Sequence, residues 1–280
     1  MVSYLNLGCG RRFHPDWTNV DFTSTSDRVI AHNLIQGIPF PDAAFDVVYH
    51  SHVLEHFSKA QAQAFLSECC RVLRPQGVLR VVVPDLEQIV RSYLMALEKA
   101  STDAVWQANY DWILIEMYDQ VARNYSGGEM AAYLFQENIP NEAFILQRCG
   151  TEAKNLIALG RDRPQQSSAA SIKRLLKSSL RLRRYPSYLR ELIFKLLLGK
   201  EYSALQIGRF RQSGEVHQWM YDRHSLGMLL KQTGLTDIMQ RSATESVIPN
   251  WTSWGLDTEP DGSVYKPDSL FMEAIKPSIE

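Results

Sequence analysis

The sequence predicts an α/β fold, a doubly wound and mostly parallel sheet with a helical insertion. Three observations support this prediction: the glycine turn LNLGCG at residues 5–10, the short apolar segment NVDF that ends near an acid, and a strand–helix–strand series over residues 45–84. Buried strands that alternate with amphipathic helices are typical of parallel sheets that carry helices on both faces.

The glycine turn is well suited to approach a nucleotide. Gly8 and Gly10 lack Cβ, so the backbone can turn sharply and come close to a ligand. Asp21 lies at the end of the next predicted strand and can accept hydrogen bonds from two ribose hydroxyls, as the acid of dinucleotide-binding units does. A G-x-G pair alone is also typical of an ordinary strand-ending turn. The segments that follow therefore have to distinguish a nucleotide-binding turn from an ordinary one.

Residues 45–84 contain the strand–helix–strand series. A buried strand is expected from Phe45 onward, running into a helix near His56. One helical face then follows at the spacing i, i+3, i+4, i+7, formed by Leu66, Cys69, Cys70 and Leu73. Pro75 and Gly77 end that helix, and the apolar run 78–84 predicts a second buried strand.

In this order, LNLGCG, NVDF, IPFPDAAFDVVYHSHVLEHF and RVLRPQGVLRVVVPD resemble the core of class I S-adenosylmethionine-dependent methyltransferases. The likeness is greatest to small predicted methyltransferases found with bacterial surface-glycan genes. It covers about residues 3–90 and resumes near His217 with HQWMYDRHSL, ESVIPNW and KPDSLFMEAIK. The resemblance implies a Rossmann-like fold, S-adenosylmethionine as the cofactor, and O-methylation of a glycan, lipid-linked sugar or small metabolite.

Two core segments and an insertion are expected. Residues 1–100 and 215–280 form the cofactor-binding core, and residues 101–214 form a helical insertion or lid, with a flexible joint at 164–171. Asp222 or Ser225 can cap a helix that ends at Gly234. Two last strands, near 236–242 and 269–276, are expected to form the antiparallel edge of the sheet.

The insertion contains a basic amphipathic stretch at 172–200, although the whole chain has a net charge of −1. Nine lysines and arginines stand there against the single acid Glu191. Apolar residues at helical spacing precede and follow Pro186. The helices can contact an anionic surface, such as a membrane face or a lipid-linked substrate, or pack as a lid on the core with solvated cations. Binding of nucleic acid is disfavoured because no aromatic residues are interleaved with the charges.

Composition and targeting signals point to the cytoplasm, with peripheral membrane contact as an option. The four cysteines show neither metal-ligand spacing nor a disulfide framework. The first residues run directly into a strand, which is unlike a signal peptide, and no run of 18 uncharged apolar residues is present.

The resemblance assigns nine cofactor-binding residues: Leu7, Gly8, Cys9, Gly10, Asp21, Asn33, Leu34, His50 and Ser51. Asn33 stands where the family usually has an acid, so its contact with the adenine amino group lacks charge assistance. The interval between Gly10 and Asp21 is too short for a helix plus a strand. Arg11 or Arg12 then either points at the cofactor carboxylate or remains solvated, and Asp46 is expected to be structural.

Four residues are candidates for the reaction: His52, Glu55 and His56 near the end of the fourth predicted strand, and His217 in the segment that returns to the core. His52, His56 and His217 are the candidate catalytic residues, because a histidine can deprotonate a hydroxyl near neutral pH. His52, Glu55 and His56 resemble the E-x-x-E-H metal motif of some methyltransferases, with His52 in place of the first acid. A third interpretation is that these side chains only cap and pack the helix; the favoured interpretations need no metal.

Two other functions remain open. A non-catalytic relative would keep the fold as a binding or scaffold module, against which the intact glycine turn and Asp21 argue. A nicotinamide-dependent oxidoreductase needs G-x-G-x-x-G at the start of a full helix, and Phe13 stands at the last glycine position. The aromatic residues Trp106, Trp112, Tyr118, Trp219 and Tyr221 either line a substrate cleft or belong to the core.

Overall fold

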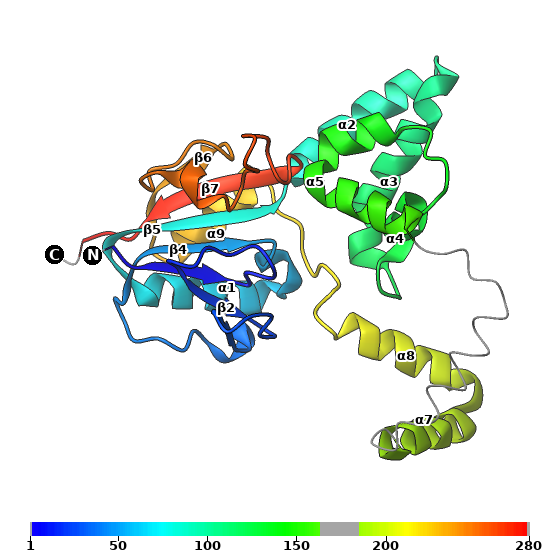
Figure 1. Cartoon of the computed structure of the whole chain (residues 1–280), viewed down its shortest axis with the longest axis horizontal. Coiled ribbons are helices and arrows are strands. Elements are labelled where there is room, and N and C mark those ends of the chain that lie inside the picture. The colour runs from blue at the N-terminus through cyan, green and yellow to red at the C-terminus, as the bar shows by residue number, and fades with distance from the viewer. Residues whose placement is uncertain (1, 163–184, 279–280) are drawn as a thin grey trace.

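The computed structural model describes residues 2–162 and 185–278. Figure 1 shows a central sheet, a lobe of helices at one end of it, and a helix pair that stands apart from both. The sheet has seven strands in the order β3-β2-β1-β4-β5-β7-β6. Their bounds are β1 Tyr4–Leu7, β2 Thr18–Asp21, β3 Val29–Ala31, β4 Phe45–Ser51, β5 Leu73–Pro84, β6 Thr236–Arg241 and β7 Ser269–Ile275.

The strand directions confirm the mostly parallel sheet with an antiparallel last strand. β1 to β5 pair in parallel, and β7 pairs antiparallel with both β5 and β6. The last two strands thus form an antiparallel pair at the edge of the sheet, as expected, and the last strand runs against all the others. Helix α9 (Arg223–Gln232) precedes β6, and β7 inserts between β5 and β6, so β6 runs in the direction of β5.

The two faces of the sheet are covered differently. On one face α1 (Lys59–Val72) and α9 pack over a core that includes Leu5, Val48 and Leu79. Asp222 caps α9 with the expected capping box. On the other face Trp17 and Trp251 pack with Tyr49 and Phe271. No helix lies between β1 and β2 in this described part of the chain, which confirms the shortened first connection.

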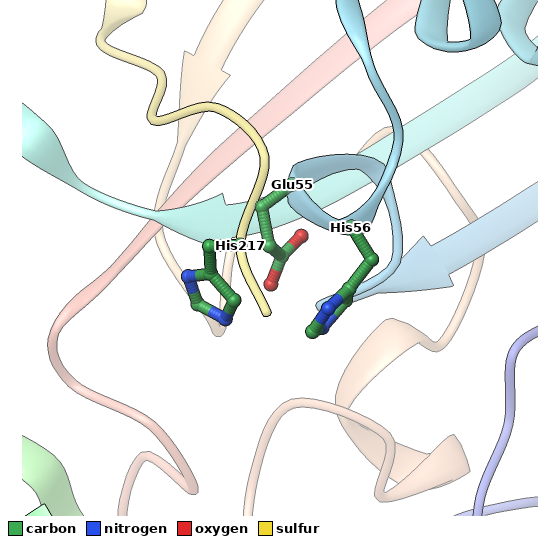
Figure 2. A group of neighbouring side chains, drawn as sticks. All are labelled: Glu55, His56 and His217. Carbon is green, nitrogen blue, oxygen red and sulfur yellow. The ribbon is translucent and has the colours of Figure 1, made fainter. Parts of the chain in front are cut away.

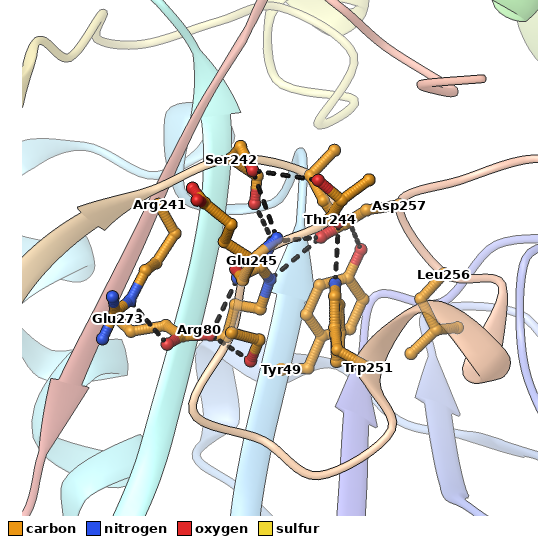
Figure 3. Close-up of polar contacts among 12 residues, drawn as sticks. Tyr49, Arg80, Arg241, Ser242, Thr244, Glu245, Trp251, Leu256, Asp257 and Glu273 are labelled. Carbon is orange, nitrogen blue, oxygen red and sulfur yellow. Dashed lines mark hydrogen bonds and ion pairs between the residues drawn. The ribbon is translucent and has the colours of Figure 1, made fainter. Parts of the chain in front are cut away.

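Loop 242–268 covers that second face and is fixed by a buried arginine (Figure 3). Arg80 on β5 is fully buried and donates to Asp257 (Nε–Oδ2 2.9 Å) and Glu273 (Nη1–Oε1 2.7 Å). It also donates to the carbonyls of Ser242 and Glu245. A buried charge has to be paired and hydrogen-bonded in this way to be tolerated. The loop is therefore anchored against the sheet.

A helical lobe follows β5. It contains α2 (Leu86–Ala100), α3 (Gln107–Ala122), α4 (Gly128–Leu134) and α5 (Glu142–Arg161), around a core with the fully buried Trp112. α2 packs on α3, with Ala96 in the core of the lobe. α2 lies within residues 1–100, which the sequence assigns to the core, and packs against the first long helix of the expected insertion. The short 3-10 helices are η1 Leu34–Gln36, η2 Leu54–His56, η3 Ala104–Trp106, η5 Gly199–Glu201 and η6 Trp251–Trp254.

The helix pair consists of α7 (Tyr185–Leu198) and α8 (Tyr202–Arg211). Glu191 joins them by accepting hydrogen bonds from Tyr202 and Arg209. Residues 172–184 of the predicted basic stretch lie outside the described residues. Five large apolar side chains of α7 are exposed: Leu189, Leu192, Ile193, Leu196 and Leu197. Their exposure does not fit the prediction that they pack as a lid on the core. No helix within 2–162 or 185–278 is long and apolar enough to cross a membrane.

Candidate functional site

A cavity of about 410 Å³ lies where β1 and β4 end. This is the carboxyl edge of the parallel strands, where ligands of open α/β sheets bind. Its lining comes from the glycine turn, the ends of β4, helix α5 of the lobe and loop 242–268. The lining residues are Asn6, Gly8, Cys9, Gly10, Arg11, Arg12, Tyr49, Ser51, Thr151, Asn155, Leu256, Glu259, Tyr265 and Lys266. The volume falls in the range of small-molecule sites.

The glycine turn has the backbone that its sequence predicts. Gly8 and Gly10 have φ angles of 65° and 55°, a region that favours glycine. A Cβ on Gly8 would lie 2.2 Å from Cγ2 of Val53, whereas no described atom lies within 4 Å of a Cβ built on Gly10. Gly8 therefore permits close packing inside the protein, and Gly10 leaves open space at the cavity.

Asp21 is connected to the turn by a direct hydrogen bond. The amide of Gly10 donates to Oδ2 at 2.7 Å, and the amide of Thr23 donates to Oδ1 at 3.2 Å. A carboxylate has about four lone-pair positions, so each oxygen keeps one position for a further donor. The side chain is only partly buried. Two neighbouring hydroxyl groups, such as those of a ribose, match this remaining capacity.

The other predicted cofactor residues are placed less uniformly. Ser51 lines the cavity, as do Gly8, Cys9 and Gly10. Burial, and then the charge of Asp21, raises the pKa of the Cys9 thiol to about 12. Leu7 and His50 are fully buried on the face of the sheet that α1 covers, and neither lines the cavity. The carbonyl oxygen of the Asn33 side chain accepts from the amide of Ile35 and caps η1.

Leu34 packs in η1 against the core rather than at the cavity. His50 lies against Phe65, and burial lowers its pKa to about 4. The resemblance to methyltransferases assigned both residues to the cofactor. The alternation of side chains along a strand points His50 to the face that α1 covers.

The two arginines after the glycine turn have different surroundings. Arg12 donates to the carbonyls of Leu256 and Thr258 and contacts Glu259, so it holds loop 242–268, while its side chain, 28% exposed, also lines the cavity. Arg11 is exposed at the rim of the cavity. Asp46 lies away from both, accepts from the amide of Ser3 and pairs with Arg74, which confirms its structural role.

The candidate catalytic residues form one cluster. Glu55 and His56 lie in η2, and His217 lies in the segment that returns from the helix pair; Figure 2 shows the Glu55 carboxylate between the two imidazole rings. The ring centroids of His56 and His217 are 4.7 Å apart. His52 lies next to them, with Nδ1 3.2 Å from Oε1 of Glu55 and Nε2 2.9 Å from the hydroxyl of Ser269.

Burial decides the charge state of this cluster. It lowers the pKa of His217 to about 3 and also lowers the pKa of His56, so both rings are neutral near pH 7. Burial alone raises the pKa of Glu55, but the adjacent His52 and then His217 and His56 outweigh it and lower it to about 2. The cluster thus combines a carboxylate with neutral imidazoles.

A second polar group lies beside the cavity. Lys266 lines the cavity and pairs with Glu152 of α5 at 2.8 Å, which outweighs burial and raises the pKa of the lysine. Burial, then the charge of Glu116, raises the pKa of Asp268 to about 6, against the charges of His52 and Lys266. The lobe therefore contributes charged groups to the site through α5.

Sequence reasoning missed the residues that the lobe and loop 242–268 bring to the cavity, including Thr151, Asn155 and Tyr265. They lie far along the chain from the glycine turn and have no local motif. Of the aromatic residues considered for a cleft, Trp112 and Tyr221 are buried in cores. None of the five lines the cavity within the described part of the chain.

The strand order, the glycine turn after β1 and the acid after β2 define a Rossmann-like fold of the class I methyltransferase type. Residues 5–81 match the family model described as a methyltransferase domain. A protein of Mycolicibacterium smegmatis described as a probable S-adenosylmethionine-dependent methyltransferase is 50% identical over 56 residues, which are 20% of this chain and 21% of that protein. The comparisons thus show that residues 5–81 are similar to a methyltransferase domain.

Solved structures give weaker likenesses. A SAM-dependent methyltransferase of Archaeoglobus fulgidus aligns over 98% of this chain and 86% of its own, with 11% identity and a TM-score of 0.39. A 1,6-didemethyltoxoflavin-N1-methyltransferase of Burkholderia thailandensis, solved with S-adenosylhomocysteine, aligns over 30% and 45%, with 20% identity and a TM-score of 0.25. The chain spans about a fifth of the curated relative and these scores are low, so neither comparison identifies an acceptor.

Proposed function

We propose that this protein is an S-adenosylmethionine-dependent methyltransferase that transfers a methyl group to a hydroxyl of a glycan, a lipid-linked sugar or a related small metabolite. The observation that carries the proposal is the connection between the glycine turn and Asp21. The turn opens onto a cavity of about 410 Å³, and Asp21, which does not itself line the cavity, keeps two acceptor positions next to Gly10, which does. A nucleoside with two ribose hydroxyls fits that arrangement.

Methyl transfer requires alignment, exclusion of water and, for an oxygen nucleophile, removal of a proton. The bound cofactor supplies an activated methyl group. Helix α5 of the lobe and loop 242–268 line the cavity next to the turn and shield part of it from water, and alignment of the acceptor is an effect of proximity. The S–CH₃ bond breaks as the O–CH₃ bond forms, and the hydroxyl proton has to pass to a base.

His52, His56 and His217 do not themselves line the cavity, and we place the base at His52 because of its neighbours. It follows Ser51, which lines the cavity, and its ring is held between Glu55 and Ser269. A carboxylate next to one ring nitrogen orients a histidine and stabilises its protonated form. His56 and His217 are held neutral by burial, and so are less suited to take up a proton.

A calorimetric titration and a matched pair of variants test this proposal. We expect the full chain to bind S-adenosylhomocysteine and not NAD. With an accepted sugar, His52→Gln is expected to lower kcat about 100-fold, within the range of general bases, while the affinity for S-adenosylhomocysteine stays unchanged. His224→Gln, at an exposed residue of α9, serves as the control. Binding of NAD alone, or of neither ligand, would overturn the proposal.

The acceptor class rests on the resemblance to methyltransferases found with surface-glycan genes and on α7. We propose that α7 contacts an anionic membrane surface, where lipid-linked sugars are found. Leu196 and Leu197 are 76% and 77% exposed, and Lys195 and Lys200 lie on or next to the same helix. Exposed apolar side chains with adjacent cations are typical of helices that lie in a membrane interface.

Sedimentation with vesicles tests the membrane contact. We expect the protein to bind vesicles that contain anionic lipids and to bind neutral vesicles more weakly. Leu196→Glu is expected to reduce binding at least about tenfold. It removes apolar area that would be buried in the membrane, and it adds a negative charge that the anionic lipids repel. Val105→Glu, at an 80% exposed residue of the lobe, is the matched control. Equal and negligible binding to both vesicles would contradict the membrane contact but would leave the methyltransferase proposal intact.

A further inference from the structure

Glu55, His56 and His217 form a cluster of side chains of the kinds that bind metal ions. One atom from each side chain lies within 4.8 Å of the others. Glu55 and His217 are 0% and 6% exposed, so they are removed from water. They come from two segments far apart in sequence, and their convergence is therefore a property of the fold.

The ligand atoms themselves are left without partners. Both carboxylate oxygens of Glu55 and the Nδ1 atoms of His56 and His217 are buried and have no hydrogen-bond partner within the described chain. Oε1 of Glu55 does face Nδ1 of His52 at 3.2 Å, but Oε2 has no such neighbour in the described ion pairs. Burial of a carboxylate oxygen, Oε2 of Glu55, and of two ring nitrogens without partners is costly, which indicates that something else satisfies them.

The backbone around the cluster is held firmly. The amide of Gln218 donates to the carbonyl of Glu55 at 2.7 Å, and the amide of His217 donates to the carbonyl of Gln120 in α3 at 2.9 Å. His56 makes a further hydrogen bond to the backbone of Val216, which leaves its Nδ1 as the nitrogen without a partner. Metal-bound histidines commonly use their other ring nitrogen in such a bond.

We propose that Glu55, His56 and His217 bind one divalent transition-metal ion, with Zn²⁺ as the best match. Two imidazoles and one carboxylate form a known protein ligand set for zinc and leave a position for water or another oxygen ligand. In a tetrahedral site with bonds of about 2.1 Å the ligand atoms are about 3.4 Å apart. Small side-chain rotations would close the present spacing to that value. The proposal stands independently of methyl transfer.

A comparison inside the same protein supports the choice of this cluster. Glu116, Cys149 and Asp268 also offer potential ligand atoms that lie within 4.8 Å of one another. There, however, Arg148 donates to both carboxylate oxygens of Glu116. That carboxylate is already neutralised by a cation, whereas Glu55 has only histidines beside it. The second group is therefore expected to bind no metal.

The test is a titration of the full chain with Zn²⁺ and Co²⁺ after dialysis against a chelator. We expect one ion per chain, visible d–d absorption with Co²⁺, and weaker binding of Mg²⁺. His217→Gln and Glu55→Gln are expected to reduce affinity by more than the roughly 10–100-fold that loss of an outer-shell partner costs. Circular dichroism of each variant shows whether it is folded.

Two controls make the result decisive. His224→Gln, an exposed histidine of α9, and Cys149→Ser, in the second group, should leave zinc affinity unchanged. For variants that do not fold, the wild-type protein is tested instead: added Zn²⁺ should raise its melting temperature, and the rise should continue with the logarithm of the Zn²⁺ concentration above Kd. Absence of stoichiometric binding by the wild type, or unchanged affinity in folded His217→Gln and Glu55→Gln, would overturn the proposal.

Discussion

Replacement of Asp21 by asparagine tests the nucleoside site with little change in shape. The asparagine side chain would keep one oxygen, which can still accept from the amide of Gly10, now at 2.7 Å from Oδ2 of the aspartate. It would lose the charge and the acceptor positions of the second oxygen. Both proposed ribose hydrogen bonds therefore weaken, and one of them disappears.

The magnitude follows from the number of bonds affected. A hydrogen bond to a charged group contributes about 1.5–3 kcal/mol. Loss of one such bond and of the charge in the other should cost about 2–4 kcal/mol, which is roughly a 30-fold to 900-fold increase in Kd. The bond from Thr23 is long, at 3.2 Å, so its loss should change the stability of the fold by only about 1 kcal/mol.

Isothermal titration with S-adenosylhomocysteine measures the change directly. Asp27→Asn is the matched control, because Asp27 is exposed in the same loop region and accepts from the hydroxyl of Ser26. We expect its Kd to remain within about twofold of the wild type. A folded Asp21→Asn protein whose Kd equals that of the control would refute the assignment of Asp21 to the ribose.

Three further predictions concern the turn, the buried arginine and pH. Gly8→Ala should lower the melting temperature because its Cβ meets Val53, whereas Gly10→Ala should spare stability more and weaken S-adenosylhomocysteine binding; equal effects in thermal melts would contradict this. Arg80→Met should destabilise the fold by about 3–5 kcal/mol in urea titrations, because two buried acids lose their partner. The pKa of Asp268 is raised to about 6 from 3.8, so the native state binds the extra proton and stability should fall as pH rises between these values. Asp268→Asn should remove that part of the pH dependence, and an unchanged profile would argue against it.

Local patterns in the sequence were sufficient for much of the fold and for the turn. Positive φ angles at Gly8 and Gly10, the capping box of Asp222 and the missing helix before β2 all depend on neighbouring residues. Such features are predictable because short-range sterics and hydrogen bonds determine them.

Long-range contacts account for what could not be predicted. His217 meets Glu55 only because the return segment hydrogen-bonds to η2 and α3. Arg12 is used by loop 242–268, more than 240 residues away in sequence. In both cases the residue type was noticed, but its partner depends on how the lobe and the loop pack against the sheet.

The central claim is that the cavity at the glycine turn binds the nucleoside of S-adenosylmethionine. Titration of the wild-type full chain with S-adenosylhomocysteine, with NAD in a parallel experiment, tests it most directly. We predict one S-adenosylhomocysteine site per chain and no measurable binding of NAD. Binding of NAD alone, or no heat with S-adenosylhomocysteine from a folded protein, would contradict the claim.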